Sequence, residues 1–249
     1  MSESLPAVDA PQGIIKLQHP LRNLFNALRG SEPVRIVAMG SSSTAGRADV
    51  VPCPYRLEMY LRQHYAEPLP NTRIDVLNRG KGGQEAPEEL KRFKTDIFPD
   101  SPSLVLWQIG TNAVFHKDKY KFKDVVDAIT DGVHRLLQPR EQPMDVVLID
   151  PQYGTAMLRD DKAELSEKMV MEIRRIAETK KVNVFQRWAL MRHWHVQNGV
   201  SFEQLLDPTD CPDMLHQSDW STLQVSKALC RAITDAVLAA SWLPADRQS

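Results

Sequence analysis

The chain lacks both the long apolar run and the one-sided charge that would assign it to a membrane or to nucleic acid. No apolar segment approaches the roughly 18 residues that a bilayer-spanning helix needs. Lys and Arg number 31 and Asp and Glu number 32 in 249 residues, which gives a net charge of −1. Because neither sign dominates, the sequence predicts no membrane span and no nucleic-acid partner.

Cysteine is also scarce, and the N-terminal residues lack the features of a signal peptide. Cys53, Cys211 and Cys230 form an odd set without a C-x-x-C pair. This pattern favours reduced thiols, and one disulfide with a free thiol is the alternative. The opening MSESLPAVDAPQG has neither a basic cluster nor an apolar stretch. We therefore expect a cytoplasmic protein from the sequence as written; the alternative is a periplasmic or secreted protein whose leader has been removed.

Repeats, low-complexity tracts and linkers are missing as well, so the sequence predicts one large domain. Residues 1–16 are expected to be a loosely ordered lead-in, and residues 17–249 a single domain. A domain of this length buries about 75% of the surface of its unfolded chain, so it needs no metal or disulfide to complete a core. An oligomeric state does not follow from the sequence.

What is present is an alternation of two periodicities. Apolar, β-branched runs of strand type occur at 34–39, 72–78, 104–109, 145–150 and 182–185, and helix-type segments at 55–65, 86–98, 121–137, 161–181, 186–197 and 219–241. Nearly continuous apolar strands that alternate with amphipathic helices are typical of a parallel sheet covered on both faces. We expect an α/β protein: a three-layer α/β/α sandwich around a parallel, five-stranded, flavodoxin-like sheet.

Polar and glycine-rich segments follow the first four expected strands. They read GSSSTAG (40–46), NRGKGGQ (78–84), GTNAVFH (110–116) and PQYGT (151–155). Right-handed crossovers bring all of these loops to the carboxyl edge of the sheet, where open α/β sheets bind their ligands. The sequence therefore predicts the functional site at this edge.

The glycine loops do not fit the common nucleotide or nucleophile motifs. Five residues separate Gly40 from Gly46 and Arg47 follows, whereas a P-loop needs four residues and then Lys. The dinucleotide pattern that starts at Gly80 requires glycine where Glu85 stands. The G-x-S-x-G elbow fails because Thr44 occupies its last position. A simple helix cap by the serines is the remaining alternative for GSSSTAG.

Residues for acyl transfer are present in the other polar segments. Such chemistry needs a hydroxyl, a base, a group that orients the base, and donors for the developing oxyanion. Asp213 and His216 lie three apart in DPTDCPDMLHQSDWS (207–221), so a carboxylate and an imidazole can face the same side of a turn. Gly83 can offer a backbone N–H and Asn112 a side-chain amide.

In this order, G-S-S-S-T-A-G, N-R-G-x-G-G, G-T-N and D-x-x-H resemble the four blocks of the SGNH (GDSL-type) serine hydrolases, bacterial members in particular. The blocks span about 180 residues, nearly the whole expected domain. The resemblance implies Ser42 as nucleophile, Asp213 and His216 as acid and base, and an oxyanion hole made by Ser42 N–H, Gly83 and Asn112. It implies no cofactor and no metal.

The chain departs from this family at two positions. The family usually has Asp before the nucleophile and after G-T-N, where this chain has Ser41 and Ala113. Neither residue breaks bonds, so we expect an active enzyme from a different subfamily. The final block, Asp213 to Ser221, resembles bacterial members that are commonly exported, which favours the alternative location.

Several other residues at the expected edge invite a role. Ser41, Gln152, Tyr153 and Trp220 are candidates for substrate contact, although loop or packing roles are equally consistent with their positions. His193 and His195 would share a face on a strand and could bind zinc, but their segment favours a helix, which points them apart. If the protein is exported, Cys53 and Cys211 could form a disulfide.

The sequence thus predicts a serine esterase that works through an acyl-enzyme. No apolar lid stands out, so a short acyl ester, such as an acetyl group on a carbohydrate, is the expected substrate. A thioesterase or lysophospholipase would use the same residues. A non-catalytic carbohydrate-binding protein on the hydrolase fold is the alternative from a different class.

Overall fold

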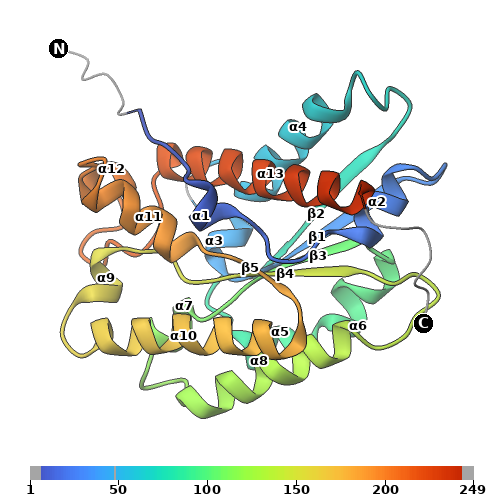
Figure 1. Cartoon of the computed structure of the whole chain (residues 1–249). Helices are drawn as coiled ribbons and strands as arrows, with labels where there is room; N and C mark the ends of the chain where they lie inside the picture. Colours follow the sequence, from blue (N-terminus) through green and yellow to red (C-terminus); the bar gives the residue numbers. More distant parts are fainter. Residues whose placement is uncertain (1–6, 48, 243–249) are drawn as a thin grey trace.

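Five parallel strands form the centre of the protein. The computed structural model describes residues 7–47 and 49–242 (Figure 1). The strands are β1 (Val34–Gly40), β2 (Ile74–Gly80), β3 (Leu104–Gln108), β4 (Asp145–Ile149) and β5 (Asn183–Phe185). All pairs are parallel, in the order β2-β1-β3-β4-β5. This is the flavodoxin-like order that the sequence predicts, and it confirms the expected fold class.

Helices cover both faces of this sheet (Figure 1). On one face lie α1 (Gln12–Ile15), α2 (Arg22–Leu28), α4 (Cys53–Tyr65) and α13 (Asp219–Ser241), and on the other lie α5 (Ala86–Lys91), α8 (Phe122–Leu136) and α10 (Lys162–Lys180). The remaining elements are α3 (Ser42–Ala45), α6 (Phe93–Asp96), a 3-10 turn η1 (Phe98–Asp100), α7 (Thr111–Phe115), α9 (Thr155–Leu158), α11 (Arg187–Val196) and α12 (Phe202–Leu205).

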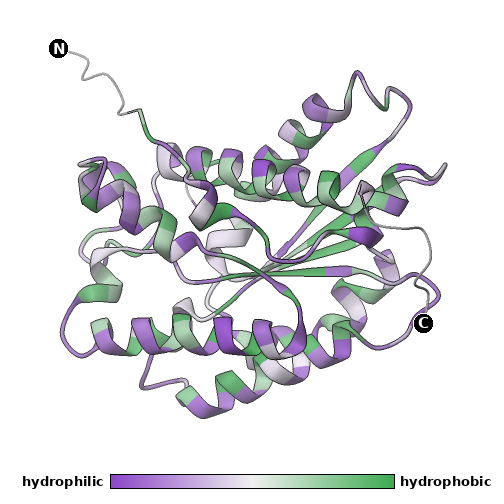
Figure 2. Cartoon of the chain, in the orientation of Figure 1, coloured by the Kyte–Doolittle hydropathy of each residue, from purple (hydrophilic) through white to green (hydrophobic). Residues whose placement is uncertain are grey.

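The sheet separates two apolar cores because neighbouring side chains of a strand point to opposite faces. In β1, Ile36 belongs to the core beneath α4 and α13, whereas Val37 belongs to the core above α8 and α10. In β3, Leu106 and Trp107 divide in the same way. The covering helices carry hydrophobic and hydrophilic stripes in alternation (Figure 2). Because a core lies on each face of the sheet, apolar residues follow one another along the strands with few interruptions.

The expected helix over 86–98 is not continuous. It divides into α5, α6 and η1, and the first break falls at Arg92. The Arg92 guanidinium is buried and donates to the carbonyl of Arg79 over 3.1 Å. Periodicity does not reveal such a break, because the residues on both sides keep the same apolar stripe.

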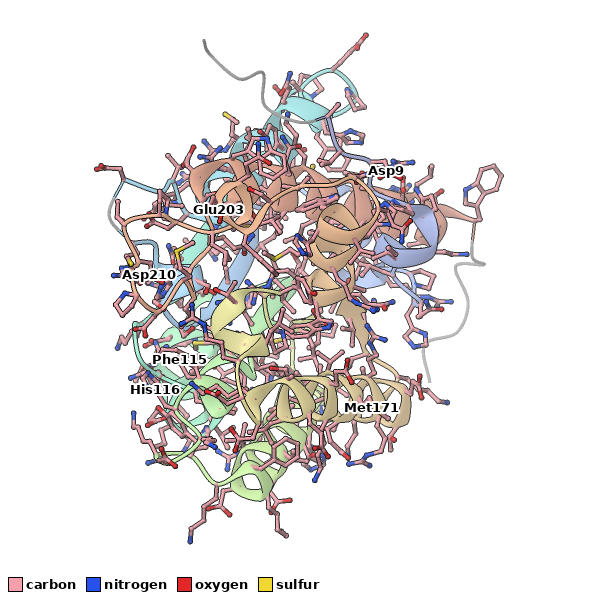
Figure 3. All side chains as sticks on the ribbon, turned by 90° about the vertical axis from the view of Figure 1, so that its left-hand side faces the viewer. Asp9, Phe115, His116, Met171, Glu203 and Asp210 are labelled. Atoms are coloured by element: carbon pink, nitrogen blue, oxygen red, sulfur yellow. The ribbon has the colours of Figure 1, made fainter. Side chains whose placement is uncertain are left out.

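The expected lead-in over residues 1–16 is partly ordered. Residues 1–6 lie outside the described residues. Among the described residues of this segment, the Asp9 carbonyl accepts a 2.7 Å hydrogen bond from Trp194 Nε1. The Asp9 carboxylate contacts His193. Ile15 of α1 is buried in the core. The segment from Asp9 onward therefore packs against the rest of the chain, and Figure 3 shows Asp9 in the upper part of the view.

Among residues 7–47 and 49–242, no helix combines the length and the apolar character that a membrane crossing requires.

Candidate active site

The loop that carries Ser42 is held against the ends of β1 and β2. Ser42 is the first residue of α3, directly after the cap Ser41. A Cβ on Gly80, at the end of β2, would lie 2.2 Å from the Ala45 nitrogen. Glycine at position 80 therefore allows α3 to lie directly on the sheet. Asn78 adds a 3.2 Å hydrogen bond to the Ala45 carbonyl, which fixes the end of this short helix.

Ser42, His216 and Asp210 form a connected chain of side chains. Ser42 Oγ lies 2.7 Å from His216 Nε2, and His216 Nδ1 lies 2.8 Å from Asp210 Oδ2. The two residues of the first contact are 174 positions apart in the sequence. Their contact is the geometry in which an imidazole takes a proton from a hydroxyl while a carboxylate orients its other nitrogen.

The carboxylate on His216 is not the one that the D-x-x-H pattern indicates. Asp213 is exposed, and its charge acts on His116 instead. Burial and the Lys119 and Lys162 cations lower the pKa of His116, and the Asp213 carboxylate opposes this shift. Asp210 instead accepts hydrogen bonds from the backbone nitrogens of Leu215 and His216, each over 2.9 Å. The expected contact between Asp213 and His216 is therefore wrong, and Asp210 takes this place, because the loop folds back over Asp210 and turns residue 213 outward.

Arg47 completes the polar contacts of Asp210. Its guanidinium forms an ion pair with Asp210 Oδ1. The same nitrogen lies 2.8 Å from His216 Nδ1, but a guanidinium cannot accept a hydrogen bond. Since Nδ1–H donates to Asp210, we take the Arg47–Nδ1 approach as a contact and not as a bond. Burial raises the pKa of Asp210, but the His216 backbone and ring donors and the Leu215 N–H outweigh burial and leave this pKa below its usual value.

Figure 3 shows Asp210 on the same side of the molecule as Phe115 and His116, at the end of α7. Asn112, near the start of α7, is buried, and its Nδ2 donates to the Gln84 carbonyl over 2.8 Å. Gly83 has a φ of +73°, a backbone conformation that favours glycine. Its neighbour Gly82 lies beside Ser42, since a Cβ added to Gly82 would be 3.8 Å from Ser42 Cβ. The loop after β2 thus touches both Ser42 and Asn112. The structure brings the segments of the four sequence blocks together.

Three of the four candidates for substrate contact lie away from solvent. Ser41 and Gln152 are buried, with exposed fractions of 3% and 0%. Trp220 is also buried and packs edge-on against Trp194. The structure places these three side chains among other protein groups, and their contact with a substrate stays a prediction. Tyr153 is half-buried and packs against Trp188 and Phe202.

Gln152 has a bracing position that the sequence analysis did not identify. Its Oε1 accepts hydrogen bonds from Thr111 over 3.0 Å and from Arg187 over 2.8 Å, and lies 3.5 Å from Ser43 Oγ. Its Nε2 donates to the Leu215 carbonyl over 3.2 Å. One amide therefore links the loop of Ser43, the turn of Asn112 and the loop of His216. The position of Gln152 directly after a buried strand predicts that it lies at the site. A polar side chain in this position can bind a ligand or join protein loops, and the sequence does not distinguish these two roles.

The remaining candidates have structural partners. The three cysteines are free thiols, and the structure does not join Cys53 to Cys211. Cys53 is close to Ser226, and burial raises the pKa of its thiol.

His193 and His195 lie on α11, where His193 contacts Asp9 and His195 stacks on Phe202. Within residues 7–47 and 49–242, no three His, Cys, Asp or Glu side chains are placed to share a metal ion.

A comparison with protein families identifies the type of protein. The sequence model of the non-GDSL lipase-like family matches residues 7–239. The chain belongs to this family. The match agrees with the resemblance to SGNH hydrolases and with the departure from it at Ser41. A comparison with curated proteins gives no match.

Solved structures of hydrolases share the fold. LAE5, an α/β hydrolase enzyme from the metagenome of Lake Arreo in Spain, has 18% identity and a TM-score of 0.62, and the alignment covers 86% of this chain and 99% of that one. Axe2, an acetylxylan esterase from Geobacillus stearothermophilus, has 18% identity and a TM-score of 0.62 over 84% and 96%. A lipase/acylhydrolase from Enterococcus faecalis has 21% identity and a TM-score of 0.64 over 81% and 96%.

Proposed function

We propose that this protein is a serine esterase with Ser42 as nucleophile, His216 as general base and Asp210 as the carboxylate that orients the base. The observation that carries the proposal is the unbroken chain from Ser42 Oγ to His216 Nε2 and from Nδ1 to Asp210, at 2.7 and 2.8 Å. Membership of a lipase-like family supports an ester-bond hydrolase.

In the first half of the reaction His216 Nε2 takes the proton of Ser42 while Oγ attacks the acyl carbonyl carbon. The carbonyl π pair moves to oxygen and gives a tetrahedral intermediate. When the carbonyl re-forms, the bond to the alcohol oxygen breaks and His216 returns the proton to the leaving alcohol. Water then attacks the acyl-enzyme in the same way, and its proton passes through His216 back to Ser42.

The developing oxyanion needs donors that are already in place. Asn112 uses one Nδ2 hydrogen for the Gln84 carbonyl, so its second hydrogen is the donor that we assign to the oxyanion. The backbone N–H groups of Ser42 and Gly83 complete the proposed set. Such donors are effective because they need no reorganisation when charge develops.

A short acyl group is the substrate part that we propose, because the shared fold with an acetylxylan esterase agrees with a carbohydrate acetate as substrate. The small cavity beside Ser42 and His216, about 20 Å³ in volume, is lined on its other sides by residues such as Gly46, Arg47 and Pro52. It therefore lies away from Gly83 and Asn112 and does not set the length of the acyl group.

The test is a panel of p-nitrophenyl esters, from acetate to decanoate, and acetylated xylo-oligosaccharides, each with wild type and Ser42→Ala. We expect turnover to be highest for acetate and absent in Ser42→Ala. A preference for long chains or for thioesters would instead identify a lysophospholipase or thioesterase. Mass spectrometry after incubation with a fluorophosphonate gives the second readout. A folded wild type that is neither labelled at Ser42 nor active would favour the non-catalytic carbohydrate-binding alternative.

A further inference from the structure

A buried carboxylate lies behind the proposed oxyanion residue Asn112. Glu85 is 2% exposed and begins α5 in the loop after β2. Its Oε1 accepts hydrogen bonds from the backbone nitrogens of Ala86 and Gly110, and its Oε2 accepts one from Ala113, each over 2.9 Å. Gly110 and Ala113 flank Thr111 and Asn112, so both oxygens of one carboxylate hold the ends of this turn.

The turn depends on this carboxylate because it has no cap of its own. Gly110 is the N-cap of α7 and has no side chain, with a φ of +86°. The first N–H groups of a helix have no partner within the helix and need an acceptor. Glu85 supplies that acceptor from another segment, 25 residues away from Gly110 in the sequence.

The residue before Glu85 holds the side chain of Asn112. The Gln84 carbonyl accepts from Asn112 Nδ2 over 2.8 Å, which fixes the plane of the amide. Glu85 itself is held by a capping box, in which its N–H donates to Glu88 Oε2 over 3.2 Å. Consecutive residues, 84 and 85, therefore fix the amide and the backbone of the same asparagine.

From these contacts we propose that Glu85 is a positioning residue, which sets the direction of the Asn112 amide by holding the Gly110–Ala113 turn. This inference rests on the proposed esterase function. It assigns Glu85 no contact with substrate, because its side chain is enclosed. Its effect belongs to the transition state, where the oxyanion needs the amide within hydrogen-bond distance, and not to substrate binding.

The test is Glu85→Gln, with Glu89→Gln as the matched control. Glutamine has the size of glutamate but one acceptor oxygen, so its NH₂ group must face one of the backbone donors. Glu89 is also buried and lies one turn further on α5, but its Oε2 accepts from Trp107 Nε1 over 2.7 Å, which a glutamine oxygen can also do. Burial raises the pKa of Glu89, and the nearby Glu85 raises it further. Burial also raises the pKa of Glu85, but there the backbone N–H donors of Gly110, Ala86 and Ala113 oppose it.

With p-nitrophenyl acetate as substrate, we expect Glu85→Gln to lower kcat by about 10- to 100-fold. This loss is smaller than the fall in kcat of about 10²- to 10³-fold that follows removal of an oxyanion donor itself. KM should stay within about twofold, and Glu89→Gln should change neither constant by more than about twofold, since it leaves the turn intact. In an Asn112→Ala background the same Glu85→Gln change should cost less than about threefold, because the amide that it positions is already gone. Affinity for trifluoroacetone, whose adduct with Ser42 places an oxyanion in the hole, should fall in parallel with kcat.

An active wild type whose folded Glu85→Gln variant keeps its kcat would overturn the inference and leave the proposed esterase intact. A full additive loss in the Asn112→Ala background would also overturn it, since Glu85 would then act on something other than Asn112. If Glu85→Gln does not fold, Glu85→Asp is the second variant: its carboxylate is one methylene shorter, and a smaller loss confined to kcat is expected. Unchanged kcat in Glu85→Asp would contradict the inference. A wild type without esterase activity would refute the proposed function and this inference together.

Discussion

Replacing Asp210 by asparagine tests which aspartate orients the imidazole of His216. Asp210 Oδ2 accepts three N–H groups, from Leu215, from the His216 backbone and from Nδ1, while Oδ1 meets Arg47. Asparagine has only one acceptor oxygen. If this oxygen replaces Oδ2, the new NH₂ faces the Arg47 cation. If the amide is turned, the NH₂ faces three donors and favours the wrong tautomer of His216.

The size of the effect follows from the lost charge. An imidazolium and a carboxylate with charge centres about 4 Å apart attract by about 4 kcal/mol at an effective dielectric constant of 20. Since about 1.36 kcal/mol corresponds to a factor of ten in rate, Asp210→Asn should lower kcat by about 10³. The asparagine substitution in the triad of chymotrypsin-type proteases costs about 10⁴, so the two estimates are of similar size.

The assay is kcat for p-nitrophenyl acetate between pH 6 and 9, with Asp213→Asn as control. Asp213 is exposed, and the structure shows no hydrogen bond of its side chain to another described residue. We expect this variant to keep kcat within about twofold, and melting curves establish that both variants are folded. A collapse of activity in Asp213→Asn with near-normal Asp210→Asn would refute the geometry, and the acid would then be the D-x-x-H aspartate.

Three further substitutions test the framework around the site. Gln152→Ala leaves buried donors of Thr111 and Arg187 without an acceptor and should lower the free energy of unfolding by about 1–3 kcal/mol; an unchanged urea midpoint would contradict this. Gly80→Ala would place Cβ 2.2 Å from the Ala45 nitrogen, so both the melting temperature and kcat should fall. Burial raises the pKa of Asp145 from 3.8 to about 6. The folded state therefore binds more protons between pH 4 and 6, and stability falls as pH rises through this window. In Asp145→Asn that fall should be smaller, as denaturant unfolding at several pH values would show.

The strands were predictable because their residues are mostly apolar and are bounded by glycine or polar residues; β3 is buried along its whole length, whereas most of β2 is half-buried. β1 contains the predicted run 34–39 and one further residue, Gly40, whereas β4 ends at Ile149, one residue before the end of the predicted run 145–150. Short elements were not predictable, because the contacts that form them come from elsewhere in the chain. The four residues of α3 are helical on the ends of β1 and β2, and α7 is capped by Glu85 from a different loop.

The contact between Ser42 and His216 was predictable because chemistry restricts the residue types that can serve a proposed acyl transfer. Only a few side chains can serve as nucleophile, base or amide donor, and the structure brings Ser42 and His216 into contact. The orienting acid was not predictable by spacing, because Asp207, Asp210 and Asp213 all precede His216 at intervals of three. Asp207 accepts from Thr209 within its own turn, and only the path of the chain decides that Asp210 faces the imidazole.

Buried polar side chains, and not the strands, give this edge its shape. Gln108 Oε1 accepts from Thr44 over 3.1 Å, Gln152 joins three loops, and Glu85 holds the turn of Asn112. Each of these polar groups would be costly to bury without its partners, because an unsatisfied group loses its hydration. The same requirement makes alternative loop arrangements unfavourable, since moving one loop leaves donors or acceptors of another unpaired. The loops can therefore hold Ser42 against His216 in one arrangement. The proposed oxyanion hole requires such an arrangement, because its donors must be in place before the charge develops.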